Sequence, residues 1–195
     1  MKHITVFCAS NLGTDPQYEA AARTLGRFLA AQKITLVYGG GRVGLMGTLA
    51  DAVLAEQGRV IGVIPQFLLD MEVGHLGLTE LHVVESLHER KLKMADLCDG
   101  VIALPGGFGT LEELIEFITW SQLDLHRKPV GILNVRGYYN LLRQFFDHMV
   151  GEGLLKPENR DLAIFEEDIE RLYKKMSMFK PPNATEWGTS DSRKT

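Results

Sequence analysis

One stretch decides the fold, Leu104-Pro105-Gly106-Gly107-Phe108-Gly109-Thr110-Leu111-Glu112-Glu113. In it an apolar run ends, three glycines follow and an acidic amphipathic run begins, which predicts a strand, a tight turn and the start of a helix. Glycine lets the backbone approach a ligand closely, and the first turn of a helix offers unpaired N–H groups and the positive end of its dipole. The pattern is therefore that of a phosphate-binding turn.

The same stretch has a simpler interpretation. Glycines between a strand and a helix often form only a turn, and Thr110-x-x-Glu113 has the spacing of a capping box, which any helix can use. The stretch alone favours neither interpretation, so the choice depends on the rest of the chain.

A second strand, glycine turn and helix occur upstream. An apolar run at residues 34–38 ends in Gly39-Gly40-Gly41, and the helix that follows is expected to close at Gly58. The first strand is predicted at residues 4–8. Asp15 and Pro16 are expected to be the N-cap and first residue of a helix that ends near residue 32.

The remaining chain continues the alternation of strands and helices. Residues 65–77 are loop-rich, and Ser86-x-x-Glu89 is a capping box at the start of a helix. Further strands are predicted at residues 60–64, 81–84, 100–104, 130–133 and 163–165, and further helices at residues 87–98, 138–150 and 169–178. Short apolar strands alternating with helices predict an α/β fold, a doubly wound parallel sheet with helices on both faces. Residues 1–180 are expected to form a single domain and residues 181–195 a disordered tail.

Three turns are expected to share one crevice. In a doubly wound sheet a ligand lies outside the carboxyl ends of the strands, where the strand order switches direction. Ala9-Ser10-Asn11, Gly39-Gly40-Gly41 and residues 105–110 all follow strands. The pattern G-x-G-x-x-G is absent from the first of these turns, and G-x-x-x-x-G-K-[ST] is absent altogether. A mononucleotide or a sugar phosphate therefore fits better than a dinucleotide.

Composition narrows the class of partner. The 195 residues are 45% hydrophobic, and basic and acidic side chains are interspersed with a net charge of −4, which argues against nucleic acid and anionic membranes as partners. The chain begins without a signal-peptide pattern, and no apolar run reaches membrane-spanning length. Cys8 and Cys98 have neither metal-ligand nor disulfide spacing and are interpreted as inert core thiols. A cytoplasmic protein that binds a small molecule and no metal is expected.

Arg90 is placed unusually for a surface residue. On the helix opened by Ser86 it shares a face with Leu87, Met94 and Leu97, so it is expected to point inward. It also lies near the positive end of the helix dipole, where a cation is disfavoured unless an anion compensates. The simpler interpretation is an arginine that pairs with a nearby glutamate or lies over apolar surface. Lys91 is interpreted as a solvated neighbour on residue pattern alone.

The helix after the glycine turn has two apolar faces. Leu111, Leu114, Ile115 and Ile118 are expected to form its core stripe, which leaves Glu113, Phe117 and Trp120 on the other side. Large aromatic side chains away from the core indicate a subunit interface, so a dimer through this helix is expected. The alternatives are ordinary packing under the chain's own loops and, for Glu113, a role only as a capping residue.

These motifs together resemble one known family. Residues 105–113, Glu89-Arg90-Lys91, and Gly39-Gly40-Gly41 followed by Gly44-Leu45-Met46-Gly47 are similar to the LOG ("lonely guy") family of cytokinin riboside 5′-monophosphate phosphoribohydrolases. The resemblance runs from the first strand to about Gly153. Phe108 stands where tyrosine is common, which bears on substrate preference. The family has also been labelled lysine decarboxylase, but no lysine here lies in the usual context of a pyridoxal phosphate Schiff base.

The resemblance implies a Rossmann-like nucleotide-binding fold and a homodimer. It also implies hydrolysis of the N-glycosidic bond of a purine nucleoside 5′-monophosphate, AMP or N6-prenyl-AMP, to free base and ribose 5-phosphate without a cofactor. Arg90 and Glu113 are the implied catalytic pair. The implied substrate contacts, among which residues 107–110 hold the phosphate, are Ser10, Gly41, Glu72, Lys91, Met94, Gly106, Gly107, Phe108, Gly109, Thr110, Glu112 and Thr119.

The residue types suit this chemistry. Breaking an N-glycosidic bond passes through an oxocarbenium-like sugar, and a carboxylate such as Glu113 stabilises its charge, orients the ribose hydroxyls or activates water. The pKa of an arginine is too high for easy proton donation, so Arg90 is assigned an electrostatic role. The rival hypothesis is a non-catalytic nucleotide or cofactor carrier on the same fold, which would not need the two residues as a unit.

Overall fold

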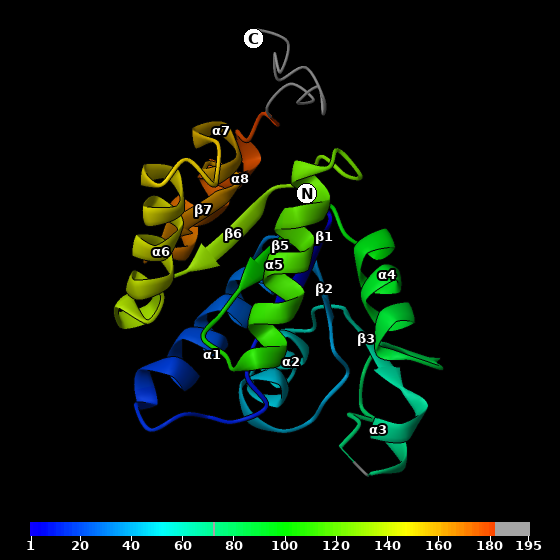
Figure 1. The fold of residues 1–195 in the computed structure, drawn as a ribbon. Coiled ribbons are helices and arrows are strands. Elements are labelled where there is room, and N and C mark those ends of the chain that lie inside the picture. The colour runs from blue at the N-terminus through cyan, green and yellow to red at the C-terminus, as the bar shows by residue number, and fades with distance from the viewer. Residues whose placement is uncertain (72, 182–195) are drawn as a thin grey trace, which may run out of the picture.

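The computed structural model describes residues 1–71 and 73–181, and in them one seven-stranded parallel sheet dominates (Figure 1). Its strands run in the order β4-β3-β2-β1-β5-β6-β7, and each neighbouring pair is parallel. The strands are β1 (His3–Phe7), β2 (Thr35–Tyr38), β3 (Val60–Pro65), β4 (Glu80–Val84), β5 (Gly100–Ala103), β6 (Val130–Leu133) and β7 (Ala163–Glu166). The order grows outward from β1 in one direction and then from β5 in the other. The predicted doubly wound sheet is therefore confirmed, with its switch point between β1 and β5.

Helices cover both faces of the sheet because successive strand side chains point to opposite sides. The helices are α1 (Pro16–Ala31), α2 (Gly44–Ala55), α3 (Gln66–Asp70), α4 (Leu87–Leu97), α5 (Phe108–Gln122), α6 (Asn140–Gly151), α7 (Pro157–Arg160) and α8 (Ile169–Ser177), with a 3-10 turn η1 (Val135–Gly137) before α6 (Figure 1). Ile4 and Val6 of β1 pack in one core cluster with α1, α2 and α8, whereas Phe7 packs in a second cluster with α4, α5 and α6.

Two predicted helix caps are confirmed. The Asp15 side chain accepts a hydrogen bond of 2.9 Å from the Gln17 N–H, and Pro16 is the first residue of α1. Ser86 Oγ accepts one of 3.1 Å from the Glu89 N–H at the start of α4, while the Glu89 carboxylate accepts from the N–H of Glu85. These local bonds use backbone donors that a helix start otherwise leaves unpaired.

The alternative interpretation of Thr110 and Glu113 as a capping box is contradicted by the structure. Helix α5 begins earlier, at Phe108, with Gly107 as an N-cap that has no side chain to bond the first turn. Thr110 lies inside the helix, only 4% exposed, and its hydroxyl occupies the space that a Cβ at Gly106 would need. Glu113 therefore lies in the second turn, and capping does not account for it.

The predicted core stripe of α5 is also wrong in part. Leu114 is buried as expected, but Phe117 is 2% exposed and packs against Phe7 and His126 with ring-centroid distances of 6.2 and 4.2 Å. Ile115, assigned to the core, is 39% exposed. The chain's own sheet and the segment after α5 cover the aromatic face, so Phe117 no longer indicates a subunit interface.

Smaller differences concern segment boundaries. Residues 66–70 form the short helix α3 within the stretch that the sequence left as loop, and α6 begins at Asn140 after η1. Gln57, not Gly58, adopts the left-handed conformation after α2, while Gly58 packs where a Cβ would lie 2.6 Å from Val53. Apart from Pro181, the predicted tail lies outside the described residues. Within the described ranges, no helix is long and apolar enough to cross a membrane.

Candidate active site

A cavity of about 510 Å³ lies at the switch point of the sheet, beyond the carboxyl ends of β1, β2, β3 and β5. Residues from all three predicted turns line it, so the expectation of a shared crevice is confirmed. Parallel strands place their following loops at one edge, which is why turns distant in sequence meet here.

The structure brings most of the predicted site residues to this cavity. Its lining includes Ser10, Gly41, Arg90, Met94, Gly107, Phe108, Gly109, Thr110 and Glu113. Lys91 and Glu112 instead line a smaller adjoining hollow of about 370 Å³, which Arg90 and Glu113 also border.

Two predicted contacts, Gly106 and Thr119, lie outside the cavity lining, and a third is not among the described residues. Gly106 lies one residue before the lining, with its carbonyl bonded to the Tyr138 hydroxyl. Thr119 lines neither hollow, and its hydroxyl donates to the Ile115 carbonyl on the same exposed side of α5. Glu72 lies outside the described residues.

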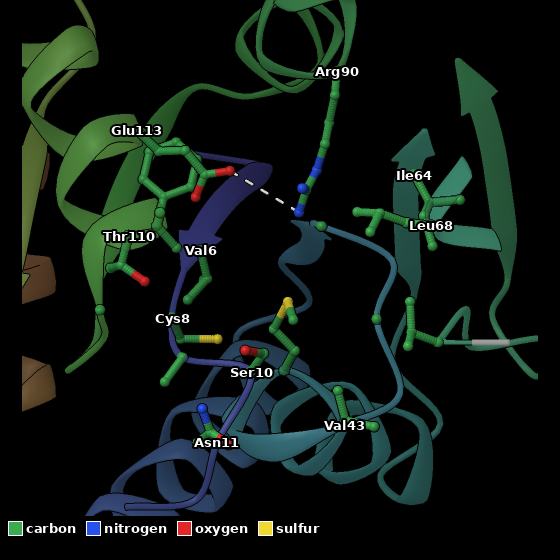
Figure 2. Close-up of a pocket in the computed structure, with 18 of the residues that line it drawn as sticks. Val6, Cys8, Ser10, Asn11, Val43, Ile64, Leu68, Arg90, Thr110 and Glu113 are labelled. Atoms are coloured by element: carbon green, nitrogen blue, oxygen red, sulfur yellow. Dashed lines mark ion pairs between the residues drawn. The ribbon is translucent and has the colours of Figure 1, made fainter. Parts of the chain in front are cut away.

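Arg90 and Glu113 meet across the cavity. An Nη of Arg90 is 4.0 Å from a carboxylate oxygen of Glu113, and the two side chains are only 12% and 14% exposed. Figure 2 shows them facing each other from separate helices, with Cys8 and Ser10 beyond them on the cavity wall. The inward orientation predicted for Arg90 is confirmed, and its partner comes from α5 rather than from the neighbouring Glu85 or Glu89.

Gly39 provides the space for the Arg90 guanidinium. A Cβ at residue 39 would lie 1.8 Å from an Arg90 Nη, so only glycine fits beside the guanidinium in its present position. Within the described part of the chain, the buried Nε of Arg90 has no hydrogen-bond partner. A buried donor without a partner costs free energy, so this arginine carries unused capacity to bind an anion or an acceptor.

Burial raises the pKa of the Glu113 carboxyl to about 7, and the Arg90 guanidinium opposes that rise only in part. Near neutral pH the carboxyl therefore exists in both protonation states. Such a pKa suits a group that exchanges a proton or a charge with a reacting substrate.

Lys91 braces the two helices that carry this pair. Its ammonium forms ion pairs with the Glu112 carboxylate and, at 2.6 Å, with that of Glu116. Burial works to lower the pKa of Lys91, but the hydrogen bonds to both carboxylates outweigh it and leave the pKa raised. The pattern-based interpretation of Lys91 as a solvated neighbour is wrong, because α5 supplies two anions that the local sequence does not reveal.

The start of α5 offers donors to an anion. Gly107 has no capping side chain, and residues 107–110 line the cavity. The first N–H groups of a helix have no partner within it, and the dipole adds partial positive charge there. Helix starts of this kind are suited to bind anions such as phosphate or carboxylate.

Comparison with known proteins identifies the family. The family model described as "Possible lysine decarboxylase" matches residues 46–176. The cytokinin riboside 5′-monophosphate phosphoribohydrolase of Rhodococcoides fascians is 50% identical over 170 residues, which cover 87% of this chain and 86% of that protein. LOG7 of Arabidopsis thaliana, which carries the same enzyme name, is 47% identical over 180 residues, 92% of this chain and 83% of that protein. The chain belongs to the LOG family.

Solved structures share the LOG fold at low sequence identity. The Moco carrier protein of Chlamydomonas reinhardtii superimposes with a TM-score of 0.68 at 19% identity, covering 91% of this chain and 98% of that one. The molybdenum cofactor binding protein of Rippkaea orientalis gives a TM-score of 0.66 at 18% identity, with 90% and 94% covered. These likenesses concern the fold alone.

Several lining residues escaped the sequence-based prediction for this LOG protein. Ile64, Leu68 and Val73 form an apolar side of the cavity, and Figure 2 places Ile64 and Leu68 across from Thr110. Gly39 could be found from its glycine triplet, but its contact with Arg90 could not.

Cys8 also lines the cavity, and burial raises the pKa of its thiol, which agrees with the predicted inert thiol. Among residues 1–71 and 73–181, no cluster of three or more His, Cys, Asp or Glu side chains is arranged to hold a metal ion.

Proposed function

We propose that this chain hydrolyses the N-glycosidic bond of cytokinin-type purine nucleoside 5′-monophosphates, AMP or N6-prenyl-AMP, to free base and ribose 5-phosphate. The enzyme names of LOG relatives at 47–50% identity support the reaction class. The observation that carries the proposal is the buried pair of Arg90 and Glu113, held 4.0 Å apart beside an uncapped helix start. A nucleotide carrier would need the helix start but not this pair.

The cavity divides into parts that match such a nucleotide. The 5′-phosphate binds at the N–H groups of residues 107–110, where the dipole of α5 is positive. Glu113, one turn further along α5, then faces the ribose. The apolar side formed by Ile64, Leu68 and Val73 receives the base and its N6 substituent.

Glu113 acts on the ribose in its charged form. The bond between C1′ and the purine nitrogen breaks with its electron pair going to the base, and the water oxygen bonds to C1′. The Glu113 carboxylate stabilises the positive charge on the sugar and takes a proton from the water, while the leaving base takes a proton from solvent. Glu113 then returns its proton to solvent. Arg90 supplies fixed positive charge beside the carboxylate and the leaving base, without proton transfer.

The test is incubation with AMP and isopentenyl-AMP, with free base and ribose 5-phosphate as the measured products. Glu113→Gln keeps the size of the side chain but removes its charge, so we expect kcat to fall by about 100-fold or more with an unchanged circular dichroism spectrum. Glu116→Gln makes the same chemical change one turn along α5, outside the cavity lining, and should leave kcat much closer to wild type.

Two outcomes would contradict the proposal. Folded wild-type protein that binds AMP without releasing base would indicate the nucleotide carrier instead. A Glu113→Gln variant with wild-type turnover would remove Glu113 from the mechanism while leaving the enzyme assignment intact.

A homodimer and a cytoplasmic location are further parts of this proposal. Leu87 of α4 and Phe108 of α5 border the smaller hollow with 52% and 94% of their surfaces exposed, and Ile115 is exposed on the same helix as Phe108. Clustered exposed apolar side chains are typical of a subunit interface. Light scattering should give twice the chain mass, and a monomer at working concentration would contradict the homodimer.

The free thiols of Cys8 and Cys98 support a reducing compartment, which cell fractionation tests.

A further inference from the structure

We propose that Tyr138 is a positioning residue for the phosphate site, which is formed by the N–H groups of residues 107–110, and that it acts through the carbonyl of Gly106. Its hydroxyl donates a hydrogen bond of 2.7 Å to that carbonyl, 32 residues earlier in the chain. This inference rests on the proposed function, because it assumes that a 5′-phosphate binds at the start of α5.

Three successive carbonyls of the turn before α5 are each bonded from outside it. The Leu104 carbonyl accepts a hydrogen bond of 2.7 Å from the Tyr139 hydroxyl, and the Pro105 carbonyl accepts one of 3.2 Å from the Ala9 N–H. The Gly106 carbonyl accepts the hydrogen bond from the Tyr138 hydroxyl. A carbonyl oxygen facing a phosphate would repel it, whereas an N–H group would attract it. Because the three carbonyl oxygens are hydrogen-bonded to these donors, they point away from a bound anion.

The hydrogen bond to the Gly106 carbonyl also sets the direction of the N–H group of Gly107. In a trans peptide the C=O and the following N–H point in opposite directions within one rigid plane, and the described chain contains no cis peptide bond. Fixing the Gly106 carbonyl on Tyr138 therefore fixes the Gly107 N–H on the side away from Tyr138. Gly107 lines the cavity and Gly106 does not, which supports assigning that N–H to the phosphate site.

Tyr138 is itself held by neighbours on both sides of the switch point. Its ring packs edge-on against Tyr18 of α1 and Tyr139, with centroid distances of 5.7 and 4.9 Å. Nearby, Arg136 of η1 forms a 3.0 Å ion pair with Asp15, the cap of α1. The ring contacts remain if the hydroxyl is removed, so the hydrogen bond can be tested without disturbing the packing.

The test is Tyr138→Phe, which deletes the donor and keeps the ring. Losing one hydrogen bond that orients a binding group should raise the KM for AMP and the Kd for ribose 5-phosphate by the same factor, roughly three- to tenfold. We expect kcat to stay within about twofold of wild type, because phosphate binding is shared by ground and transition states. Binding of adenosine, which has no phosphate, should not change.

Tyr18→Phe is the matched control, since it removes a hydroxyl from the ring that packs on Tyr138 and leaves the bond to Gly106 in place. It should have the wild-type KM and Kd. A folded Tyr138→Phe variant with wild-type affinity for ribose 5-phosphate would overturn the inference, as would an equal loss of adenosine binding.

Failure of the proposed function gives a different result. If the wild type releases no base from AMP but binds ribose 5-phosphate, and Tyr138→Phe binds it more weakly, the hydrolase proposal fails and the positioning role stands. If the wild type binds neither AMP nor ribose 5-phosphate, the phosphate site does not exist, and the hydrolase proposal and the positioning role of Tyr138 are both overturned.

Discussion

Helices α4 and α5 each supply one member of the central ion pair, but they begin in opposite ways. Ser86 caps α4 with its side chain, and Glu89 bonds back to the backbone before it. Helix α5 begins at Gly107 with no capping side chain. A capped start satisfies its own donors, whereas an open start leaves them for a ligand. Helix α4 is therefore stabilised at its start and presents Arg90 from its side, whereas the start of α5 keeps donors free for the ligand of the proposed function.

The largest expected effect is the loss of folding stability when the buried Glu113 carboxyl on α5 becomes charged. Its pKa is about 7 in the folded protein and 4.5 when unperturbed, so the folded state holds the proton more tightly than the unfolded state. Stability from this group is complete below about pH 4.5 and is lost as the pH rises through 7. Relative to Glu113→Gln, the wild-type free energy of unfolding should fall by up to about 3 kcal/mol between pH 4.5 and pH 8.

Urea unfolding of both proteins at several pH values measures this difference, in which other titrating groups cancel. Activity should follow the opposite trend, because the charged carboxylate is the active form, and kcat should rise with pH up to about 7. A pH-independent difference in stability between the two proteins would show that Glu113 titrates normally and that burial does not tune it.

A second prediction inverts the open start of α5. The space around a Cβ at Gly107 is empty to 4 Å, so Gly107→Asp should fold and place a carboxylate at the helix start. Stability should rise by only a few tenths of a kcal/mol, because glycine is itself a tolerable N-cap. The carboxylate occupies the donors and repels phosphate, so affinity for ribose 5-phosphate should fall by about tenfold or more.

Calorimetric titration of ribose 5-phosphate measures the affinity. Gly151→Asp adds the same charge at a position on α6 that is equally open, and it should leave the affinity unchanged. Wild-type affinity in Gly107→Asp would place the phosphate elsewhere in the cavity.

The two helices also show how far the sequence could predict the site. Arg90 was placed inward because its spacing to Met94 is helical, and Met94 is indeed buried. The alternative that made Thr110 the cap would start α5 too late, because the N-cap is Gly107 and a glycine N-cap carries no side-chain signal. The core face of α5 was misassigned because Phe117 and Ile115 belong to two stripes that are both apolar, and only the packing of Phe7 and His126 decides between them.

The pairing of Arg90 with Glu113 lay beyond local pattern. The two residues come from different helices, and their distance depends on the strand order that sets β5 beside β1. The family resemblance named both residues, but the space at Gly39 and the anchor at Tyr138 follow only from the assembled turns. Helical and strand periods predict which way a side chain points, whereas contacts across the switch point depend on the whole sheet.

The smallest expected effect tests the capped start of α4. Ser86→Ala removes the hydroxyl that accepts from the Glu89 N–H, which should lower the free energy of unfolding by about 1 kcal/mol. Because Arg90 is still held beside Gly39, and α4 is still braced to α5 through Lys91, the KM and kcat for AMP should remain close to wild type. Urea unfolding and steady-state kinetics on the same preparation measure both quantities. A loss of activity larger than the loss of stability would mean that the cap also positions Arg90, and the two helix starts would then differ less in function than in structure.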